Sequence, residues 1–281
     1  MFSEGRDRER FDGTPTGRRV RRAYVQIKET PHYRRDAFCA GLKANAFHLE
    51  NRLPSTPPAP GDVLVIWNRY SDKELTADLW ERQGGTVLVA ENGYIGRDAA
   101  GHQLYAISVH GHNGSGTWPA GDGARWAGLG VELQAWREGG EHILMCPNRH
   151  FGMKGLAMPV DWGARTLKAL RALTKRTIRV RPHPDGNPPE RSLAEDLANC
   201  HAMVIWASSA GVHALVAGVP VFCTSPWWIL KAAASDRLQD IEQPMRGERQ
   251  AAFERLAYAQ WTVEEIALGV PFAHLLASDA G

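Results

Sequence analysis

The sequence has few cysteines and no cysteine pair with metal-binding spacing. Cys39, Cys146, Cys200 and Cys223 lie far apart, and no Cys-x-x-Cys motif occurs. Three of the four lie in or beside apolar runs. We therefore expect reduced thiols in the core of a cytoplasmic protein, with neither a disulfide framework nor a zinc site.

Long apolar runs and a strong net charge are also missing. No stretch of 18 apolar residues occurs, so we expect no membrane span. The first 22 residues are rich in arginine and lack the apolar segment of a secretory signal. Lys and Arg number 33 and Asp and Glu 31, a formal charge of +2. This charge is too small for the whole surface to attract nucleic acid, so only local basic patches fit such a role.

Several well-known catalytic motifs are absent. The sequence contains no GxxxxGK[ST], GxGxxG, HExxH or GxSxG, which argues against P-loop enzymes, dinucleotide dehydrogenases, zincins and α/β-hydrolases. The chain does have 281 residues, of which 43% are hydrophobic. Such a chain is long enough to bury a core in one large domain or two smaller ones.

Apolar strands alternate with amphipathic helices along the chain. We predict strands at 23–28, 63–67, 87–90, 143–146, 177–180, 202–206 and 219–223, and helices at 34–44, 72–83, 161–174, 192–198, 210–217 and 262–269. Ser192 with Glu195, and Thr262 with Glu265, have the spacing of capping boxes. Continuously apolar strands between helices indicate parallel sheets covered on both faces, and thus an α/β fold with Rossmann-like units.

The same pattern predicts four parts. These are a basic segment at 1–22, a first Rossmann-like domain at 23–139, a second at 140–261, and a C-terminal helix at 262–281 that could pack back on the first domain. Residues 93–130 are rich in Gly, His and Trp and predict a long functional loop. Gly139-Gly140 is the predicted hinge.

Ser208, Ser209, Ala210 and Gly211 follow the predicted strand 202–206. Ligands of open parallel sheets bind beyond the carboxyl ends of the strands. Two hydroxyls and the first free N–H groups of a helix suit a phosphate there, and a small residue permits close approach. An ordinary helix cap explains the same residues equally simply, because serine is a preferred cap.

Arg181 and His183 alternate with two prolines directly after the predicted strand 177–180. Proline fixes φ, so the loop presents a cation and an imidazole at the carboxyl edge of the sheet. Arg149, after the strand 143–146, could face the same pocket. A simple polar turn and an ordinary surface arginine are the alternatives.

Glu91, Asn92, Gly93 and Tyr94 follow the predicted strand 87–90. We expect Gly93 to let the chain turn sharply and to leave Glu91 at the sheet edge. A carboxylate there could accept a proton from a hydroxyl if desolvation raises its pKa. A solvated glutamate in a turn is the alternative.

His110, His112 and Asn113 form a further polar group. No carboxylate or cysteine stands at ligand spacing, so we predict a substrate-contacting loop rather than a metal site. Trp227-Trp228 is interpreted as packing.

Together these motifs resemble those of GT-B glycosyltransferases. The Arg181–Pro184 and Ser208–Gly211 segments are similar to the HP and SS motifs of capsule-polysaccharide (Kdo) transferases and bacterial sialyltransferases. Glu91-Asn92-Gly93 resembles their acidic-acidic-Gly motif, in which the first carboxylate is the catalytic base. Asn92 departs from that motif, because it stands in place of the second acid.

The resemblance implies two Rossmann-like domains facing across a cleft, a UDP- or CMP-linked sugar held mainly by the second domain, and no metal or other cofactor. It implies that Glu91 and His183 are catalytic. The implied donor-binding residues are Arg181, Ser208 and Ser209. From their positions along the chain we add Ala210, Gly211 and Arg149 on the donor side, and Asn92, Tyr94, His110, His112 and Asn113 as acceptor-binding residues.

The acceptor is predicted from a looser resemblance, to short phage proteins that glycosylate 5-hydroxymethyl-pyrimidines in DNA. The target base would have to be flipped out of the duplex. Phosphate contacts would then fall to Arg18, Arg19, Arg21, Arg22, Arg34 and Arg35. A solvated terminus is the alternative interpretation of that cluster. A capsule or surface polysaccharide transferase, a nucleotide-sugar epimerase and a non-catalytic DNA-binding protein remain alternative functions.

Overall fold

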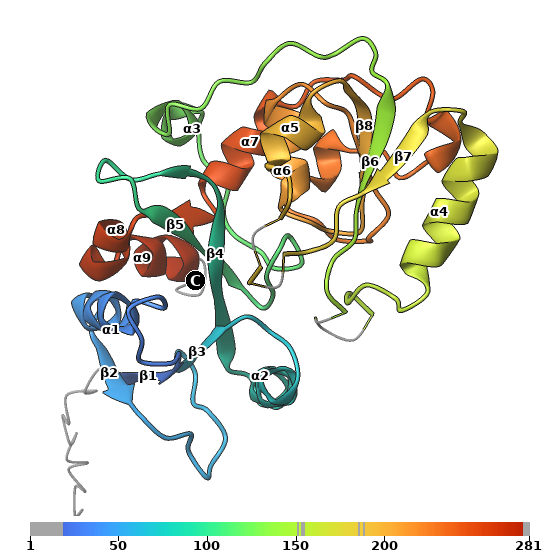
Figure 1. The fold of residues 1–281 in the computed structure, drawn as a ribbon. Helices are drawn as coiled ribbons and strands as arrows, with labels where there is room; N and C mark the ends of the chain where they lie inside the picture. The colour runs from blue at the N-terminus through green and yellow to red at the C-terminus, as the bar shows by residue number, and fades with distance from the viewer. Residues whose placement is uncertain (1–18, 151, 153–154, 185, 188, 278–281) are drawn as a thin grey trace, which may run out of the picture.

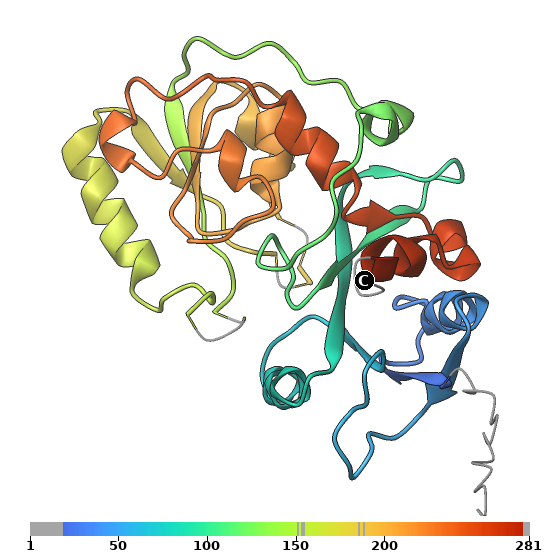
Figure 2. The same cartoon turned by 180° about the vertical axis from the view of Figure 1, so that it is seen from behind.

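The computed structural model describes residues 19–150, 152, 155–184, 186–187 and 189–277. Most of the predicted basic segment, including Arg18, lies outside the described residues. Figures 1 and 2 show two sheets connected by a long extended segment that crosses above the second sheet.

The first sheet has the strand order β10-β5-β4-β3-β1-β2. Its parallel strands are β1 (Arg21–Gln26), β2 (Phe47–Glu50), β3 (Val63–Trp67) and β4 (Thr86–Arg97). β5 (Gln103–Val109) and β10 (Gln260–Trp261) extend the sheet with antiparallel pairing. Every residue of β3 is buried, as expected for a strand covered on both faces.

The second sheet is entirely parallel, in the order β7-β6-β8-β9. Its strands are β6 (His142–Cys146), β7 (Thr177–Val180), β8 (Cys200–Ile205) and β9 (Val221–Cys223). The predicted α/β class is therefore confirmed. A hydrophobic cluster joins residues of both sheets, for example Ala90 and Ile205.

Nine α-helices lie among the described residues. They are α1 (Arg35–Ala44), α2 (Asp72–Arg82), α3 (Ala124–Gly128), α4 (Trp162–Leu173), α5 (Leu193–Leu197), α6 (Ala210–Val216), α7 (Gln250–Ala257), α8 (Val263–Leu268) and α9 (Val270–Leu276). Both predicted capping boxes are present: Ser192 with Glu195 opens α5, and Thr262 with Glu265 opens α8. Two short 3-10 turns, Lys231–Ala233 and Leu238–Asp240, follow β9.

The C-terminal part of the chain returns to the first sheet. β10 pairs with β5, and α8 and α9 lie beside α1 in Figures 1 and 2. The Asn45 side chain, after α1, donates a 2.8 Å hydrogen bond to the Gly269 carbonyl between the two last helices. The first sheet is thus completed by residues from both ends of the sequence.

The sharp turn expected at Gly93 is wrong, because Gly93 lies inside the long strand β4. Glu91 and Asn92 pair with Ala106 and Tyr105 of β5, and the register shifts further along. A Cβ on Gly93 would lie 2.6 Å from the Leu104 carbonyl oxygen. The glycine therefore allows β4 and β5 to approach each other closely and does not form a turn. β5 and α3 likewise occupy part of the region expected to be one long loop.

The hinge at Gly139-Gly140 stays a prediction, and only Gly140 of the pair is closely packed. A Cβ on Gly140 would lie 2.3 Å from the backbone nitrogen of His201. The extended segment before it is tied to the end of α6, since the Gln134 and Arg137 amides donate to the Val216 and Gly218 carbonyls, each at 2.9 Å. Gly140 is therefore packed against the second sheet, whereas a Cβ on the exposed Gly139 would meet nothing within 4 Å.

We predict that Gly93→Ala destabilises the protein by about 2 kcal/mol, because the added methyl group meets strand backbone that cannot move aside. Gly163→Ala in α4 is the control: its Cβ meets nothing within 4 Å, and alanine is the better helix former. Urea unfolding of both variants measures the difference. Equal stabilities would contradict the close-approach argument.

Candidate functional site

An open groove lies between the two sheets. Its walls come from the carboxyl ends of β3, β6, β7 and β8, from the middle of β4, and from the loop after β5. The predicted site residues that line it are Glu91, Asn92, Tyr94, His112, Asn113, Arg149, His183, Ser208 and Ser209. Residues more than 100 positions apart are thus brought together, which is the placement that parallel strands favour for ligands.

The Glu91 carboxylate is held by two donors. Its Oε1 accepts a hydrogen bond from the Tyr94 hydroxyl and one of 2.5 Å from the Asn113 backbone N–H. Burial, followed by the neighbouring charge of Glu91, raises the pKa of Tyr94 well above its usual value. The tyrosine therefore stays protonated and remains a donor. Tyr94 is 6% exposed, so its hydroxyl supports Glu91 more than it offers a surface to a ligand.

Asn92, in contrast, is exposed at the groove. Its Oδ1 accepts a 2.9 Å hydrogen bond from the Gln103 side chain on β5. Strand β5 therefore holds the Asn92 amide in place, at the position where the similar glycosyltransferase motif has its second acid.

The corner after β8 is pinned at Ala207. Its N–H donates to Asn148 Oδ1 at 3.0 Å, and its carbonyl accepts from Asn113 Nδ2 at 2.7 Å. Ser208 Oγ accepts a 3.3 Å hydrogen bond from the Ala210 N–H, whereas Ser209, at the N-cap position of α6, makes no side-chain capping bond. Ser208 thus caps the start of α6 in part, whereas the Ser209 hydroxyl does not cap it.

Ala210 and Gly211 do not line the groove. A Cβ on Gly211 would lie 2.7 Å from the ring of Trp228, which is itself 2% exposed. The glycine therefore permits helix packing rather than approach of a ligand. Trp228 packs as predicted, but Trp227 is 54% exposed and lines a smaller hollow beside the groove.

Arg181 faces away from the groove. Its guanidinium forms a 2.5 Å ion pair with Asp196 and donates to the Arg191 carbonyl at 2.7 Å. It lines a separate hollow beside β7. His183 borders both spaces, so of the two residues in this motif only the imidazole reaches the groove.

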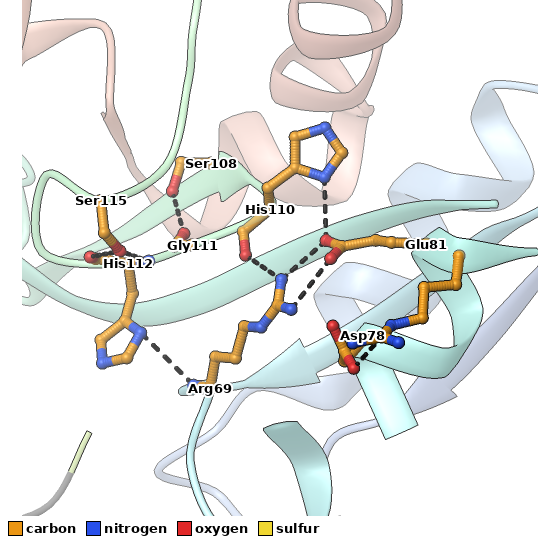
Figure 3. A network of polar contacts seen from close by, with 9 residues as sticks. Arg69, Asp78, Glu81, Ser108, His110, Gly111, His112 and Ser115 are labelled. Carbon is orange, nitrogen blue, oxygen red and sulfur yellow. Dashed lines mark hydrogen bonds and ion pairs between the residues drawn. The ribbon is translucent and has the colours of Figure 1, made fainter. Parts of the chain in front are cut away.

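His110 belongs to a polar network behind the groove, shown in Figure 3. The buried guanidinium of Arg69 binds both carboxylate oxygens of Glu81, at 2.6 and 2.9 Å. Glu81 also contacts the His110 ring at 2.9 Å, and Arg69 donates to the His110 carbonyl at 2.5 Å. The backbone N–H of Arg69 lies 3.4 Å from Nδ1 of His112. The two histidines therefore point to different partners, and the network supports the loop that carries His112.

The Arg69 network also determines the charge of Glu81. Burial alone would raise the pKa of Glu81, but the hydrogen bonds from His110 and Arg69 outweigh burial and lower it. The carboxylate therefore remains charged at neutral pH, as a buried ion pair requires.

The described part of the chain contains no cluster of three or more His, Cys, Asp or Glu side chains that could hold a metal ion. Within the same residues no helix is long and apolar enough to cross a membrane. All four cysteines are free, and burial raises the pKa of Cys146 to about 12.

The described arginines of the predicted DNA-binding set lie at two places. Arg19, Arg21 and Arg22 are at the amino end of β1, away from the carboxyl ends that face the groove. Arg21 packs its guanidinium over Phe47 at 4.3 Å and donates to the Asn45 carbonyl at 2.7 Å. Arg34 and Arg35 lie at the start of α1 and bind Asp36 and Asn51.

The groove residues that the sequence analysis missed include Asn68, Tyr70 and Asn148. Asn68 Oδ1 is buried without a hydrogen-bond partner, and its backbone has a positive φ of 52°. All three follow closely after β3 or β6. The rule that ligands bind beyond the carboxyl ends of parallel strands was the signal that could have found them.

Comparisons with known proteins give likeness in structure but not in sequence. No family model matches the chain, and no curated protein matches it. A β-Kdo 2,7-transferase of Thermosulfurimonas dismutans KpsC superposes with a TM-score of 0.54 at 13% identity, covering 88% of this chain and 98% of that one. A β-Kdo 2,4-transferase of the same KpsC gives 0.51 at 12% identity, covering 83% and 89%. The chain therefore shares the fold of these transferases, in line with the predicted GT-B class.

We predict that Glu81→Gln destabilises the protein by about 3 kcal/mol at neutral pH, because it leaves the buried Arg69 cation without its counterion. The pKa of Glu81 is lowered by folding, so the stabilisation is present above the ordinary carboxyl pKa and is lost as the pH falls through the lowered value. Urea unfolding at neutral pH and below about pH 4 should therefore show a shrinking difference from wild type.

The matched control for this prediction is Asp78→Asn on the same helix. Asp78 pairs with Arg82 at an exposed site, and such pairs contribute at most about 1 kcal/mol. An effect of Glu81→Gln no larger than that of the control would show that the network is not needed for stability.

Proposed function

We propose that the chain is a metal-independent glycosyltransferase that moves a sugar from a nucleotide-sugar to an acceptor hydroxyl. The observation that carries the proposal is the groove itself, because Glu91 of the first sheet faces His183 and Ser208 of the second across one open space. A base from one side and phosphate-binding groups from the other are what transfer between two substrates requires. The shared fold with two Kdo transferases supports the same conclusion.

In the proposed reaction, Glu91 accepts the proton of the acceptor hydroxyl. The hydroxyl oxygen forms a bond to the anomeric carbon, and the bond from that carbon to the phosphate oxygen breaks. The leaving nucleotide takes the electron pair of the broken bond. A single displacement of this kind inverts the configuration at the anomeric carbon.

In this proposal three groups stabilise the departing phosphate. Arg149 follows β6 and lines the groove, and the Ser208 hydroxyl and the His183 imidazole lie at the neighbouring strand ends. Hydrogen-bond donors already in place lower the barrier because they need no reorganisation when charge develops. Arg181 acts differently in this proposal: its ion pair with Asp196 holds the loop that carries His183.

We propose a Kdo-type sugar, carried as a CMP-sugar, as the donor. The support is the activity of the two proteins that share the fold, both of them β-Kdo transferases. A UDP-linked sugar is the competing donor. In this proposal the nucleoside lies in the hollow beside β7, which His183 borders together with the groove.

The proposed acceptor is a sugar hydroxyl of a surface polysaccharide. The 5-hydroxymethyl-pyrimidine acceptor in DNA remains a prediction, and the two separate arginine groups lend it no added support. The test incubates the protein with each donor, CMP-Kdo or UDP-sugars, and each acceptor, Kdo-terminated oligosaccharide or hydroxymethylated DNA. Mass spectrometry then shows which acceptor gains which sugar. Donor conversion without any acceptor would instead favour an epimerase.

We predict that Glu91→Gln lowers kcat by about 10² to 10⁴-fold, because general base catalysis contributes that much. The donor dissociation constant should stay near the wild-type value, since Glu91 lies on the acceptor side. Steady-state kinetics with a donor titration measures both. Glu50→Gln, at the end of β2 outside the groove, is the control. Wild-type turnover by Glu91→Gln would refute Glu91 as the base, whereas the absence of sugar transfer by the wild-type protein would overturn the proposed function.

A further inference from the structure

Asn113 contacts both sides of the groove. Its backbone N–H donates to Glu91 at 2.5 Å, and its side-chain Nδ2 donates to the Ala207 carbonyl at 2.7 Å. Glu91 belongs to the first sheet, and Ala207 is the corner immediately before Ser208 in the second. One residue therefore connects the carboxylate to the corner that carries the phosphate-binding serines.

The loop around Asn113 is held firmly. Asn113 has a φ of 51°, a left-handed conformation that asparagine tolerates better than most residues. The Ser115 hydroxyl donates to the His112 carbonyl at 2.7 Å. A Cβ on Gly114, whose φ is 86°, would lie 2.3 Å from the Trp228 carbonyl carbon. The loop is thus pressed onto the second sheet while its Asn113 amide faces Glu91.

The far end of the connection is also fixed. Asn148 accepts the Ala207 N–H at 3.0 Å, on the opposite side of the same residue from the Asn113 bond. Ala207 is 7% exposed. Two asparagine side chains, one from each side of the groove, therefore hold this corner by its amide and its carbonyl.

We propose that Asn113 is a positioning residue that sets the place of Glu91 relative to the Ala207–Ser208 corner, and so the alignment of acceptor hydroxyl and donor phosphate. The proposal rests on the proposed function, in which Glu91 is the base. Transfer requires the reacting atoms to lie about 3–3.5 Å apart, and a misplacement of about 1 Å can cost about 10²-fold in rate. The two hydrogen bonds of Asn113 fix the distance between Glu91 and the Ala207–Ser208 corner, which is the distance that such a misplacement would change.

The test compares Asn113→Gly with Asn199→Gly. Both asparagines have left-handed backbones, with φ of 51° and 53°, and glycine keeps that conformation and the backbone N–H. Asn199 is exposed and outside the groove. We expect Asn113→Gly to lower kcat about tenfold or more, with the donor dissociation constant within about threefold of wild type, since only the cross-groove bond is lost. Asn199→Gly should leave both unchanged.

A second variant keeps the proposal testable if Asn113→Gly does not fold, as judged by circular dichroism. Asn113→Asp keeps the size and the backbone tolerance but cannot donate to the Ala207 carbonyl, so it should show the same loss of kcat. A kcat equal to that of Asn199→Gly in the folded variant would overturn the proposal, and so would a loss of donor affinity alone. Wild-type turnover by Glu91→Gln would instead refute the base assignment itself.

Discussion

The strand ends that meet at one groove are the constraint on which the rest of the molecule depends. β6, β7 and β8 are parallel neighbours, so the residues that follow them emerge on the same side of the second sheet. The first sheet places β4 opposite them, with Glu91 in the strand itself. Any chemistry between a base and a phosphate here is possible because the two sheets are held in this arrangement by a shared hydrophobic cluster.

The parts of the fold that the sequence predicts well are those set by local pattern. The strand at 63–67 is fully buried and has its predicted bounds, and both capping boxes occur where hydroxyl and carboxylate stand three residues apart. The strands around the groove follow the same logic, because an apolar run between helices has few other structures open to it. Four of the residues predicted to bind phosphate, Arg149, His183, Ser208 and Ser209, therefore line the groove as expected.

The rest depended on contacts between segments far apart in sequence. Gly93 marks a turn by local rules, yet the backbone of Leu104 lies so close that glycine is required in a continuous strand. Arg181 resembles a phosphate ligand locally, but Asp196 binds it. His110, predicted to contact the substrate, contacts Glu81 of the Arg69–Glu81 ion pair instead. In each case a tertiary partner, which no local pattern reveals, decided the role of the side chain.

The central claim is that Ser208 and His183 act on one anion, and a double-mutant cycle on donor affinity tests it most directly. Calorimetric titration of the nucleotide-sugar against Ser208→Ala, His183→Ala and the double variant gives the coupling energy between the two sites. Groups that bind the same phosphate should couple by more than about 0.5 kcal/mol, because each orients the ligand for the other. If the binding free energies lost by the two single variants sum to the loss of the double variant within about 0.3 kcal/mol, the two side chains act independently. The shared phosphate site would then be refuted.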